Sequence, residues 1–564
     1  MDLSRGNGAS IPREAEADVL VIGGGAAGCV LAARLSEDSG LRVVLLEAGP
    51  DLGDVEPPAV AALYPGRAYF DPAYLWPGLS VRTGGAGRND PASLPRRPYA
   101  QGRVLGGGTA INGLGANRGA PADYDRWGDL GAEGWCWLGA EAAFARVSKA
   151  GGGNGPIPVR PAPAPPPGSF PARAAAQLAG NGVAWLADQN GPWADGLAPT
   201  ALAIDERARR VTAARAWLTP EVRARPNLAI VTECAVDRLV IEGGRVRGAV
   251  GVRGMFRARQ TVLAAGALAS PLLLMRSGIG PGAMLAAAGI AIVADRPGVG
   301  ENLLEHPAAG VAAWLPRGTR LGRAAYHIPV VQRFSSGHEG TQAGDMHLAI
   351  MGRSAWHAVG RRVGMLYVWV NQAFSKGCLA LSPDGSADID FRLLSHPADR
   401  ARLADAFRCA AREMAALSSS GACGPPFPAL LSERARRFAA PGVGAGVATG
   451  LAGVLLDCAG PLAPRLLERM ARPGISIDDL LAEPERLDSF LDRAVTGVWH
   501  ACGTCRMGAA DDPMAVTDGA GRVFGVEGLR VADASLFPTI PSANLALPTA
   551  MTAERIAAAM LAED

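Results

Sequence analysis

The stretch "ADVLVIGGGAAGCVLAARLSEDSGLRVVLLEAG", residues 17–49, predicts a strand, a glycine turn, a helix and a second strand, in that order. Its β-branched apolar run Asp18–Ile22 is typical of a buried strand, and the apolar residues that follow the turn have helical spacing. Gly23, Gly25 and Gly28 form G-x-G-x-x-G. In that motif the first glycine makes the turn, the second lets the backbone approach a pyrophosphate, and the third allows close helix–strand packing. The stretch therefore predicts a Rossmann-like α/β fold that binds a dinucleotide.

Glu47 ends the second predicted strand, 19 residues after Gly28. A carboxylate at this place accepts hydrogen bonds from a ribose and disfavours a 2′-phosphate. The N-terminus of the intervening helix also attracts phosphate charge. The predicted ligand is thus FAD or NAD, and not NADP.

The totals are typical of a multidomain globular protein. The chain has 564 residues, 49% hydrophobic and 19% charged, and its net charge of +2 gives no reason to expect a nucleic-acid partner. Nine scattered cysteines indicate reduced thiols in a cytoplasmic protein, and the polar first 17 residues lack a secretion signal. The apolar segment 439–463 contains many glycines and Asp457, so we expect a buried or substrate-contacting helix there and no membrane span.

A histidine precedes a C-x-x-C pair in "VWHACGTCRMG", residues 498–508. Taken locally, this pattern is compatible with a metal ligand, a redox dithiol or a histidine that moves protons. Further glycine-rich or strand–turn–helix blocks are "QGRVLGGGTAINGLGANRGAPADYDRWGDLGAEGWCW" (101–137), "VLAAGALASPLLLMRSGIGP" (262–281), "RPGVGENLLEHP" (296–307) and "GLRVADASLFPTIPSANLALPTAMTAERIAAAML" (528–561).

In this order the blocks resemble the glucose–methanol–choline (GMC) oxidoreductases, and the resemblance runs from about residue 16 to residue 562. Within the family the chain looks most like the 5-(hydroxymethyl)furfural oxidase and aryl-alcohol oxidase-like group. The resemblance implies an α/β (α+β overall) protein with a Rossmann-like FAD-binding domain. A second, substrate-binding domain would be built on an antiparallel sheet with helices. The FAD domain would take residues 14–155, 206–306 and 486–564, and the substrate domain residues 156–205 and 307–485.

The resemblance also implies the roles of individual residues. His500 would be the base that takes the alcohol proton, and Asn544 would hold the alcohol oxygen. Trp499 and Val368 would line the substrate pocket. FAD would be bound by Gly23, Gly25, Ala26, Ala27, Gly28, Glu47, Ala48, Arg103, Val104, Gly107, Gly108, Asn112, Gly113, Val236, Ala265, Asp533, Ala534, Asn544, Pro548 and Thr549.

No metal site is expected. A haem attachment site would need its histidine after the C-x-x-C pair, a zinc site would need more ligands nearby, and a thioredoxin-like pair would open a helix. Cys502 and Cys505 are therefore predicted to be packing residues. Of the other histidines, His306 is predicted to be structural. Those at 327, 338, 347, 357 and 396 are predicted mostly to be surface or core residues.

Departures from the family pattern narrow the expected chemistry. Ile111 stands where some members attach FAD covalently through a histidine, so we expect non-covalent FAD. Ala308 stands where choline-oxidising members carry an acidic residue, so a neutral aryl or furanic primary alcohol is the expected substrate. Arg392 could meet a carboxylate but is better explained as a surface residue.

The predicted reaction is oxidation of that alcohol to the aldehyde, and of the hydrated aldehyde to the acid, with O2 as acceptor. Four alternatives stay open: a dehydrogenase that uses a quinone or dye, a hydroxynitrile lyase with redox-silent FAD, a photodecarboxylase, and a non-enzymatic FAD-binding protein. The expected assembly is a monomer or a small homo-oligomer.

Overall fold

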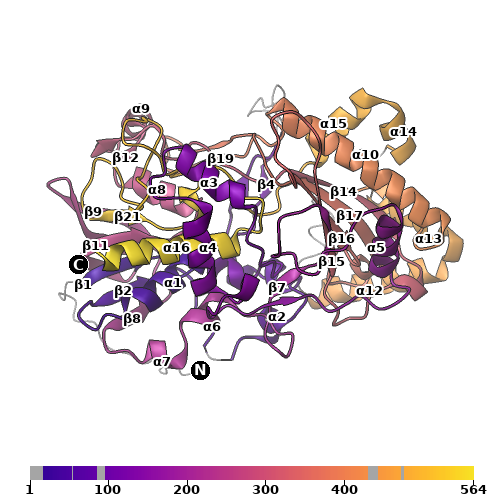
Figure 1. The fold of residues 1–564 in the computed structure, drawn as a ribbon, viewed down its shortest axis with the longest axis horizontal. Coiled ribbons are helices and arrows are strands. Elements are labelled where there is room, and N and C mark those ends of the chain that lie inside the picture. The colour runs from indigo at the N-terminus through magenta and orange to yellow at the C-terminus, as the bar shows by residue number, and fades with distance from the viewer. Residues whose placement is uncertain (1–16, 54, 85–95, 430–441, 472–474, 564) are drawn as a thin grey trace.

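The computed structural model describes residues 17–53, 55–84, 96–429, 442–471 and 475–563 (Figure 1). The N-terminal stretch on which the prediction of no secretion signal rests lies outside this range, apart from its last residue. Helices and sheets are mixed along the chain, as the sequence predicts.

The glycine motif opens the first of two large sheets. β1 (Ala17–Ile22), β2 (Val43–Leu46), β8 (Leu228–Val231), β11 (Gly254–Leu263) and β21 (Leu529–Val531) are parallel, and their order is β8-β2-β1-β11 with β21 beside β11. β10 (Arg245–Gly251) pairs antiparallel with β11, and β9 (Val236–Glu242) pairs antiparallel with β10. α1 (Ala26–Leu35) follows the turn after β1. The predicted strand, turn, helix and strand are confirmed.

Three helices from distant parts of the chain pack beside one another: α1, α4 (Trp137–Val147) and α16 (Ala546–Leu561) (Figure 1). The carboxylate of Glu554, buried in α16, accepts hydrogen bonds from Arg34 of α1 at 2.7 Å and from Arg146 of α4 at 2.9 Å. This two-sided ion pair joins the C-terminal helix to the N-terminal glycine motif.

The second large sheet is antiparallel, in the order β20-β14-β17-β16-β15-β6. Its strands are β6 (Gly196–Pro199), β14 (Ala308–Trp314), β15 (Val330–Phe334), β16 (Met346–Met351), β17 (Val363–Val370) and β20 (Pro426–Pro428). The long helix α10 (Pro397–Ser419) packs on one face of β14 and β17, and α5 (Phe170–Gly180) packs on β16 (Figure 1). The expected antiparallel sheet with helices is present.

The remaining elements connect or flank these two sheets. The helices are α2 (Pro58–Ala61), α3 (Pro121–Asp129), α6 (Ala213–Trp217), α7 (Pro220–Arg223), α8 (Ala269–Arg276), α9 (Gly282–Ala287), α12 (Val443–Cys458), α13 (Ala463–Ala471), α14 (Ile477–Ala482) and α15 (Pro484–Ala494). The strands are β3 (Ser80–Val81), β4 (Arg97–Pro98), β5 (Val159–Pro161), β7 (Ala201–Ala203), β12 (Ile279–Gly280), β13 (Ala294–Asp295), β18 (Cys378–Leu381) and β19 (Ala387–Asp390).

The domain boundaries given above remain a prediction, and one of them fits the packing poorly. Residues 486–494 were assigned to the FAD domain, yet they form most of α15, which packs on α10. The Phe490 ring of α15 contacts the Phe407 ring of α10 in a tilted arrangement, with centroids 5.5 Å apart, and Arg400 donates to Asp492 at 2.5 Å. These contacts favour a boundary near residue 495.

The apolar segment 439–463 forms α12 from residue 443 onward, and residues 439–441 lie outside the described range. Ala448, Thr449 and Ala452 line the central cavity, as expected for a substrate-contacting helix. The expectation of a buried helix is wrong for the outer face, where Val447, Leu451 and other apolar side chains are exposed. In the described part of the chain, no helix combines the length and apolarity that crossing a bilayer requires.

Gly28 and Gly25 should respond differently to alanine, although both belong to the motif. A Cβ on Gly28 would lie 1.8 Å from the Gly23 carbonyl oxygen, whereas a Cβ on Gly25 would meet nothing closer than 4.0 Å. We expect Gly28→Ala to lower the unfolding free energy of the apoprotein by about 2–4 kcal/mol because the backbone must shift. Gly25→Ala, the matched control, should change it by less than about 1 kcal/mol. Urea denaturation measures both, and equal losses would contradict this account of the motif.

Candidate active site

A single cavity of about 1460 Å³ extends from the turn after β1 to the face of the antiparallel sheet opposite α10. Most residues predicted to bind the dinucleotide contribute to its lining. These are Gly23, Gly25, Ala26, Ala27, Glu47, Ala48, Gly107, Gly108, Asn112, Gly113, Val236, Ala265, Asp533, Ala534, Asn544 and Thr549. The lining therefore unites segments that are up to about 500 residues apart, and the cavity is large enough for a cofactor together with a small substrate.

Four predicted cofactor residues are not part of this lining. Gly28 packs against Gly23, and Val104 is fully buried in a small apolar cluster with Ile111. The Arg103 guanidinium lies over the Trp76 ring, 5.7 Å from its centroid. Pro548 is buried within the first turn of α16. These residues lie behind the lining, and their contact with the cofactor stays a prediction.

Glu47 and Asp533 place two carboxylates at the dinucleotide end of the cavity. Glu47 accepts hydrogen bonds from the backbone N–H groups of Gly24 at 2.8 Å and Gly49 at 2.7 Å. Burial raises the pKa of Glu47, and these backbone hydrogen bonds oppose that rise. Because each carboxylate oxygen can accept more than one hydrogen bond, Glu47 can still receive ribose hydroxyls. These features fit the predicted dinucleotide.

Asp533 joins two turns that border the same end. Its carboxylate accepts hydrogen bonds from Gly266 N–H at 2.8 Å, the Ser270 hydroxyl at 2.6 Å and Ser535 N–H at 2.8 Å. The turn after β11 is thereby tied to the turn after β21, although these segments are more than 260 residues apart in the sequence.

His500 and Asn544 meet on the wall of the cavity. The Nε2 atom of His500 lies 3.3 Å from Nδ2 of Asn544. Asn544 is held by a hydrogen bond from its backbone N–H to Oδ1 of Asn117 at 2.9 Å. Gly115 leaves room for the amide, because a Cβ there would lie 2.5 Å from Asn544 Oδ1. The structure thus brings together the two residues that were predicted to act as a pair.

Two strand-like segments hold His500 in place. The backbone of Leu304 pairs with that of Cys502, and the backbone of Ala308 pairs with that of Thr496. The residues between these two pairings, 305–307 and 497–501, therefore face one another. Trp499 in this stretch has φ +65°, a region costly for a large side chain, as is common where structure is held for function.

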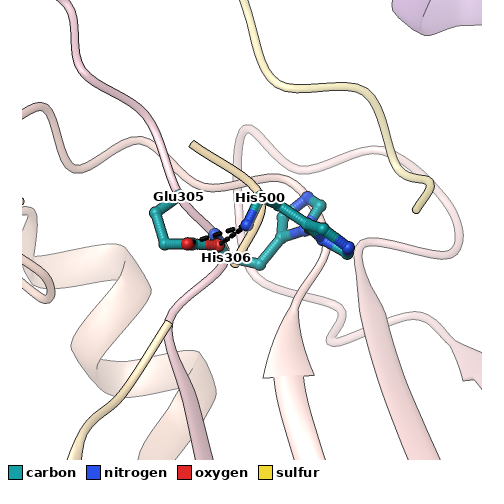
Figure 2. A group of neighbouring side chains, drawn as sticks. All are labelled: Glu305, His306 and His500. Atoms are coloured by element: carbon teal, nitrogen blue, oxygen red, sulfur yellow. Dashed lines mark hydrogen bonds between the residues drawn. The ribbon is translucent and has the colours of Figure 1, made fainter. Parts of the chain in front are cut away.

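The buried carboxylate of Glu305 fills the space between the two segments (Figure 2). It accepts hydrogen bonds from the backbone N–H of His500 at 2.8 and 2.9 Å, that of His306 at 2.9 Å and that of Val498 at 3.3 Å. The Tyr99 hydroxyl donates to it at 2.8 Å. Burial raises the pKa of Glu305 to about 7, and the hydrogen bonds hold it from rising further. The sequence does not identify this residue, because a single glutamate in "LLEHP" gives no spacing signal.

His306 contacts His500 directly. The Nδ1 atoms of the two rings lie 2.8 Å apart, with the ring planes at 85° (Figure 2). Burial lowers the pKa of His500 well below 6.5, and a positive charge on the neighbouring His306 or His347 would lower it further. Burial also lowers the pKa of His306 to about 3. Both rings are therefore neutral near pH 7.

Glu305, His306 and His500 together have the composition of a metal site. However, the Glu305 oxygens already accept hydrogen bonds from four residues, and the two Nδ1 atoms are at hydrogen-bond distance from each other. Two ligand nitrogens on one zinc, each at about 2.0–2.1 Å in tetrahedral geometry, would stand farther apart than this. The geometry is that of a hydrogen-bond network.

The C-x-x-C pair next to His500 is buried. Cys502 and Cys505 are both fully inaccessible and are not joined by a disulfide. Burial raises the pKa of both thiols, so neither forms the thiolate that redox chemistry requires. Backbone hydrogen bonds connect Cys505 N–H to the Ser535 carbonyl at 2.8 Å and Cys502 to Leu304. The geometry supports their predicted role in packing.

Aromatic side chains surround the part of the cavity next to His500. Trp499 lines it as predicted and meets Tyr69 edge to face, with centroids 5.0 Å apart. The prediction for Val368 is wrong. Side chains alternate along β17, so Val368 is buried on the α10 side while its neighbours Tyr367 and Trp369 line the cavity. A one-residue error in a strand moves a side chain to the opposite face.

The five remaining histidines fall into two groups by their position in the fold. His338 pairs with Asp405 at 3.1 Å, His396 accepts from Ala398 N–H at the start of α10, and His347 stacks on Trp369. His327 and His357 instead line the cavity.

The predictions of non-covalent FAD and of a neutral substrate depend on three residues, whose positions are as follows. Arg392 is about half exposed and lies 3.8 Å from Asp390, as expected for a surface arginine. Ile111 lines the cavity. Ala308 is fully buried at the start of β14.

The chain matches known proteins over nearly its whole length. Residues 17–308 and 373–553 match the two family models described as GMC oxidoreductase. The chain is 38% identical to 5-(hydroxymethyl)furfural oxidase of Methylovorus sp. (strain MP688), over 97% of this chain and 99% of that protein. It is 31% identical to oxygen-dependent choline dehydrogenase of Sinorhizobium medicae (strain WSM419), over 96% and 95% of the two chains.

A solved structure gives the same result. Pyridoxine 4-oxidase from Mesorbium loti superposes with a TM-score of 0.76 at 28% identity, covering 97% of this chain and 99% of that one. The relatives of this chain are thus oxidases and dehydrogenases. Its cavity, with a glycine-lined end and a histidine on the wall, is consistent with that relationship. The protein belongs to the GMC oxidoreductase family and is an FAD-dependent alcohol oxidase or dehydrogenase.

Proposed function

We propose that the protein oxidises a neutral aryl or furanic primary alcohol, resembling 5-(hydroxymethyl)furfural, to the aldehyde. The observation that carries this proposal is the pair His500 and Asn544, 3.3 Å apart on the wall of the cavity that the glycine motif also lines. The 38% identity to a 5-(hydroxymethyl)furfural oxidase supports the substrate class.

Bound FAD would accept the hydride from the alcohol carbon. The residues at the dinucleotide end that fit it are those of the glycine motif with Glu47, Val236 and Asp533, and the N-terminus of α16 would aim its positive end at the ring. Removal of the hydroxyl proton makes hydride departure favourable, and Nε2 of His500 is the base that takes this proton. The Asn544 amide donates a hydrogen bond to the same oxygen and fixes its position.

The charges around the cavity favour a neutral alcohol. Glu47 and Asp533 are the only acidic side chains in the lining that the structure describes, and both lie at the dinucleotide end. A quaternary ammonium beside His500 would find no carboxylate in the described lining. The aromatic walls formed by Tyr69, Trp499 and Trp369 suit a flat ring instead. We extend the proposal to the hydrated aldehyde, whose geminal hydroxyl presents the same O–H to His500.

The electron acceptor defines the main alternative. We propose O2, because the similar furfural enzyme is named an oxidase. A quinone- or dye-dependent dehydrogenase and a hydroxynitrile lyase with redox-silent FAD are the competing functions. Anaerobic mixing with an aryl alcohol should bleach the visible flavin band, and admission of air should restore it. Bleaching without rapid recolouring would indicate a dehydrogenase, and no bleaching would favour the lyase. The scattered free cysteines support a cytoplasmic location.

We expect the protein to purify yellow and to release all its flavin on acid or heat denaturation. Ile111 stands at the lining position where a covalent histidyl link would need an imidazole. Absorbance of the supernatant after removal of the precipitate measures the released flavin. Flavin that stays with the denatured chain would contradict non-covalent binding.

Replacing the base should slow flavin reduction without removing the flavin. We expect His500→Ala to lower the rate by about 10²–10⁴-fold, and Asn544→Ala to lower it less, because the second change removes only an orienting hydrogen bond. Stopped-flow reduction of the FAD-loaded variants measures these rates. An unchanged rate per bound flavin in His500→Ala would end the proposal.

The pH dependence should report on the same base. A base must be unprotonated to act, so the rate of flavin reduction should rise with pH through the pKa of His500 and then level off. Because burial lowers this pKa below 6.5, the rising part of the pH–rate profile, its acid limb, should lie below pH 6.5. The limb should be absent in His500→Ala. A limb centred well above neutral pH would assign the proton transfer to another group.

The neighbouring thiols should be dispensable for the reaction. We expect Cys502→Ala with Cys505→Ala to leave turnover within a few-fold, while the two small cavities lower the unfolding free energy by about 1–3 kcal/mol. Turnover and urea denaturation of the FAD-loaded double variant check both parts. A folded, FAD-loaded double variant that no longer reduces its flavin would show that the pair has a redox role.

A further inference from the structure

The contact between His306 and His500 constrains where their protons lie. With both rings neutral, each imidazole carries one N–H, and the two Nδ1 atoms are 2.8 Å apart. One Nδ1 must therefore carry the proton and donate, while the other accepts. Two arrangements are possible, and they have opposite consequences for Nε2 of His500.

The surroundings of Nε2 on His500 favour one arrangement. This atom faces the Nδ2 amide of Asn544 at 3.3 Å, and an amide nitrogen can only donate. Nε2 of His500 thus accepts, and its proton must be on Nδ1.

His306 can accept this hydrogen bond because burial keeps its ring neutral. The ring is completely buried, and its Nε2 has no hydrogen-bond partner among the described residues. When Nδ1 of His500 donates, Nδ1 of His306 accepts, and the single N–H of the neutral His306 ring lies on Nε2.

We propose that His306 is a positioning residue that holds His500 in its Nδ1–H tautomer, so that Nε2 is bare and faces the alcohol. This inference rests on the proposed function for its catalytic consequence, and on the hydrogen-bond geometry alone for the tautomer. In the reaction the hydroxyl O–H bond breaks, its proton forms the Nε2–H bond, and the hydride leaves the carbon for FAD. His500 becomes an imidazolium whose Nδ1–H still donates to neutral His306.

That last hydrogen bond also tunes the base. A hydrogen bond from a cation to a neutral acceptor is stronger than the corresponding neutral one. His306 therefore stabilises protonated His500 more than neutral His500 and opposes the loss of basicity caused by burial. Without the acceptor, the pKa of His500 should fall further, and the Nε2–H tautomer should become populated.

Asparagine and leucine at position 306 form a matched pair for the test. They have nearly the same shape, but an asparagine Oδ1 lies where Nδ1 of histidine lies and can accept the proton, whereas leucine cannot. We expect His306→Asn to reduce flavin at close to the wild-type rate. His306→Leu should lose about 10–100-fold, because part of the enzyme carries the proton on the wrong nitrogen. Its acid limb should also move to lower pH, a shift that a purely structural role would not cause.

The tautomer itself can be measured without turnover. Holoenzyme labelled with ¹⁵N-histidine gives separate NMR signals for protonated and bare ring nitrogens, and His500→Ala and His306→Asn assign the two rings. We expect Nδ1–H with bare Nε2 on His500, and the reverse on His306, in the wild type. Leucine at position 306 should make the His500 tautomers mixed or inverted.

The outcomes separate the two proposals. A wild-type His500 that carries its proton on Nε2 would overturn the inference, and this result needs no variant to fold. An unchanged tautomer and an unmoved limb in His306→Leu would overturn it as well. If the tautomers are as expected but His500→Ala reduces flavin at the wild-type rate, the proposed function fails while the positioning of His500 by His306 stands.

Discussion

The Glu305 carboxylate is the buried group on which the geometry of the active site depends. Its oxygens accept hydrogen bonds from the backbone of His306, Val498 and His500 and from the Tyr99 hydroxyl. These partners come from three parts of the chain separated by about 200 residues. A carboxylate in such a place is costly unless every neighbour donates to it. Because all of its hydrogen-bond partners donate, the group can fix the segment 305–306 against the segment 498–500.

The orientation of both histidine rings follows from this arrangement. With the two backbone segments fixed, the rings of His306 and His500 contact each other through their Nδ1 atoms. Nε2 of His500 is then directed at Asn544 and the cavity. Burial then determines the protonation state of both rings. It keeps His306 neutral, as a hydrogen-bond acceptor must be, and it lowers the pKa of His500. A weaker base removes a proton with less driving force, but it is unprotonated at neutral pH.

The sequence alone could predict those parts of the molecule where local spacing reports on local structure. The glycine motif predicted β1, α1 and β2 correctly because its requirements lie within 33 residues, and Gly28 meets Gly23 as the motif demands. The position of His500 beside Asn544 followed from the resemblance. Val368 was assigned to the wrong face because only the register of β17 separates it from Tyr367 and Trp369. Glu305 and the contact of His306 could not be predicted, because they depend on segments that the chain brings together only on folding.

The distribution of charge along the cavity connects these features to substrate choice. The end that the glycine motif lines is formed by small residues and by the carboxylates Glu47 and Asp533, both of which accept backbone N–H groups, and this lining fits the proposed dinucleotide. Next to His500 the walls are aromatic side chains carried by β17, by the 3-10 turn Ala68–Phe70 and by the segment around residue 499. Trp369 of β17 lies outside the two segments that Glu305 holds, so exchange of this ring would alter the shape of the pocket without removing a hydrogen bond to Glu305. Substrate range can therefore vary in this fold while the proton-transfer geometry stays the same.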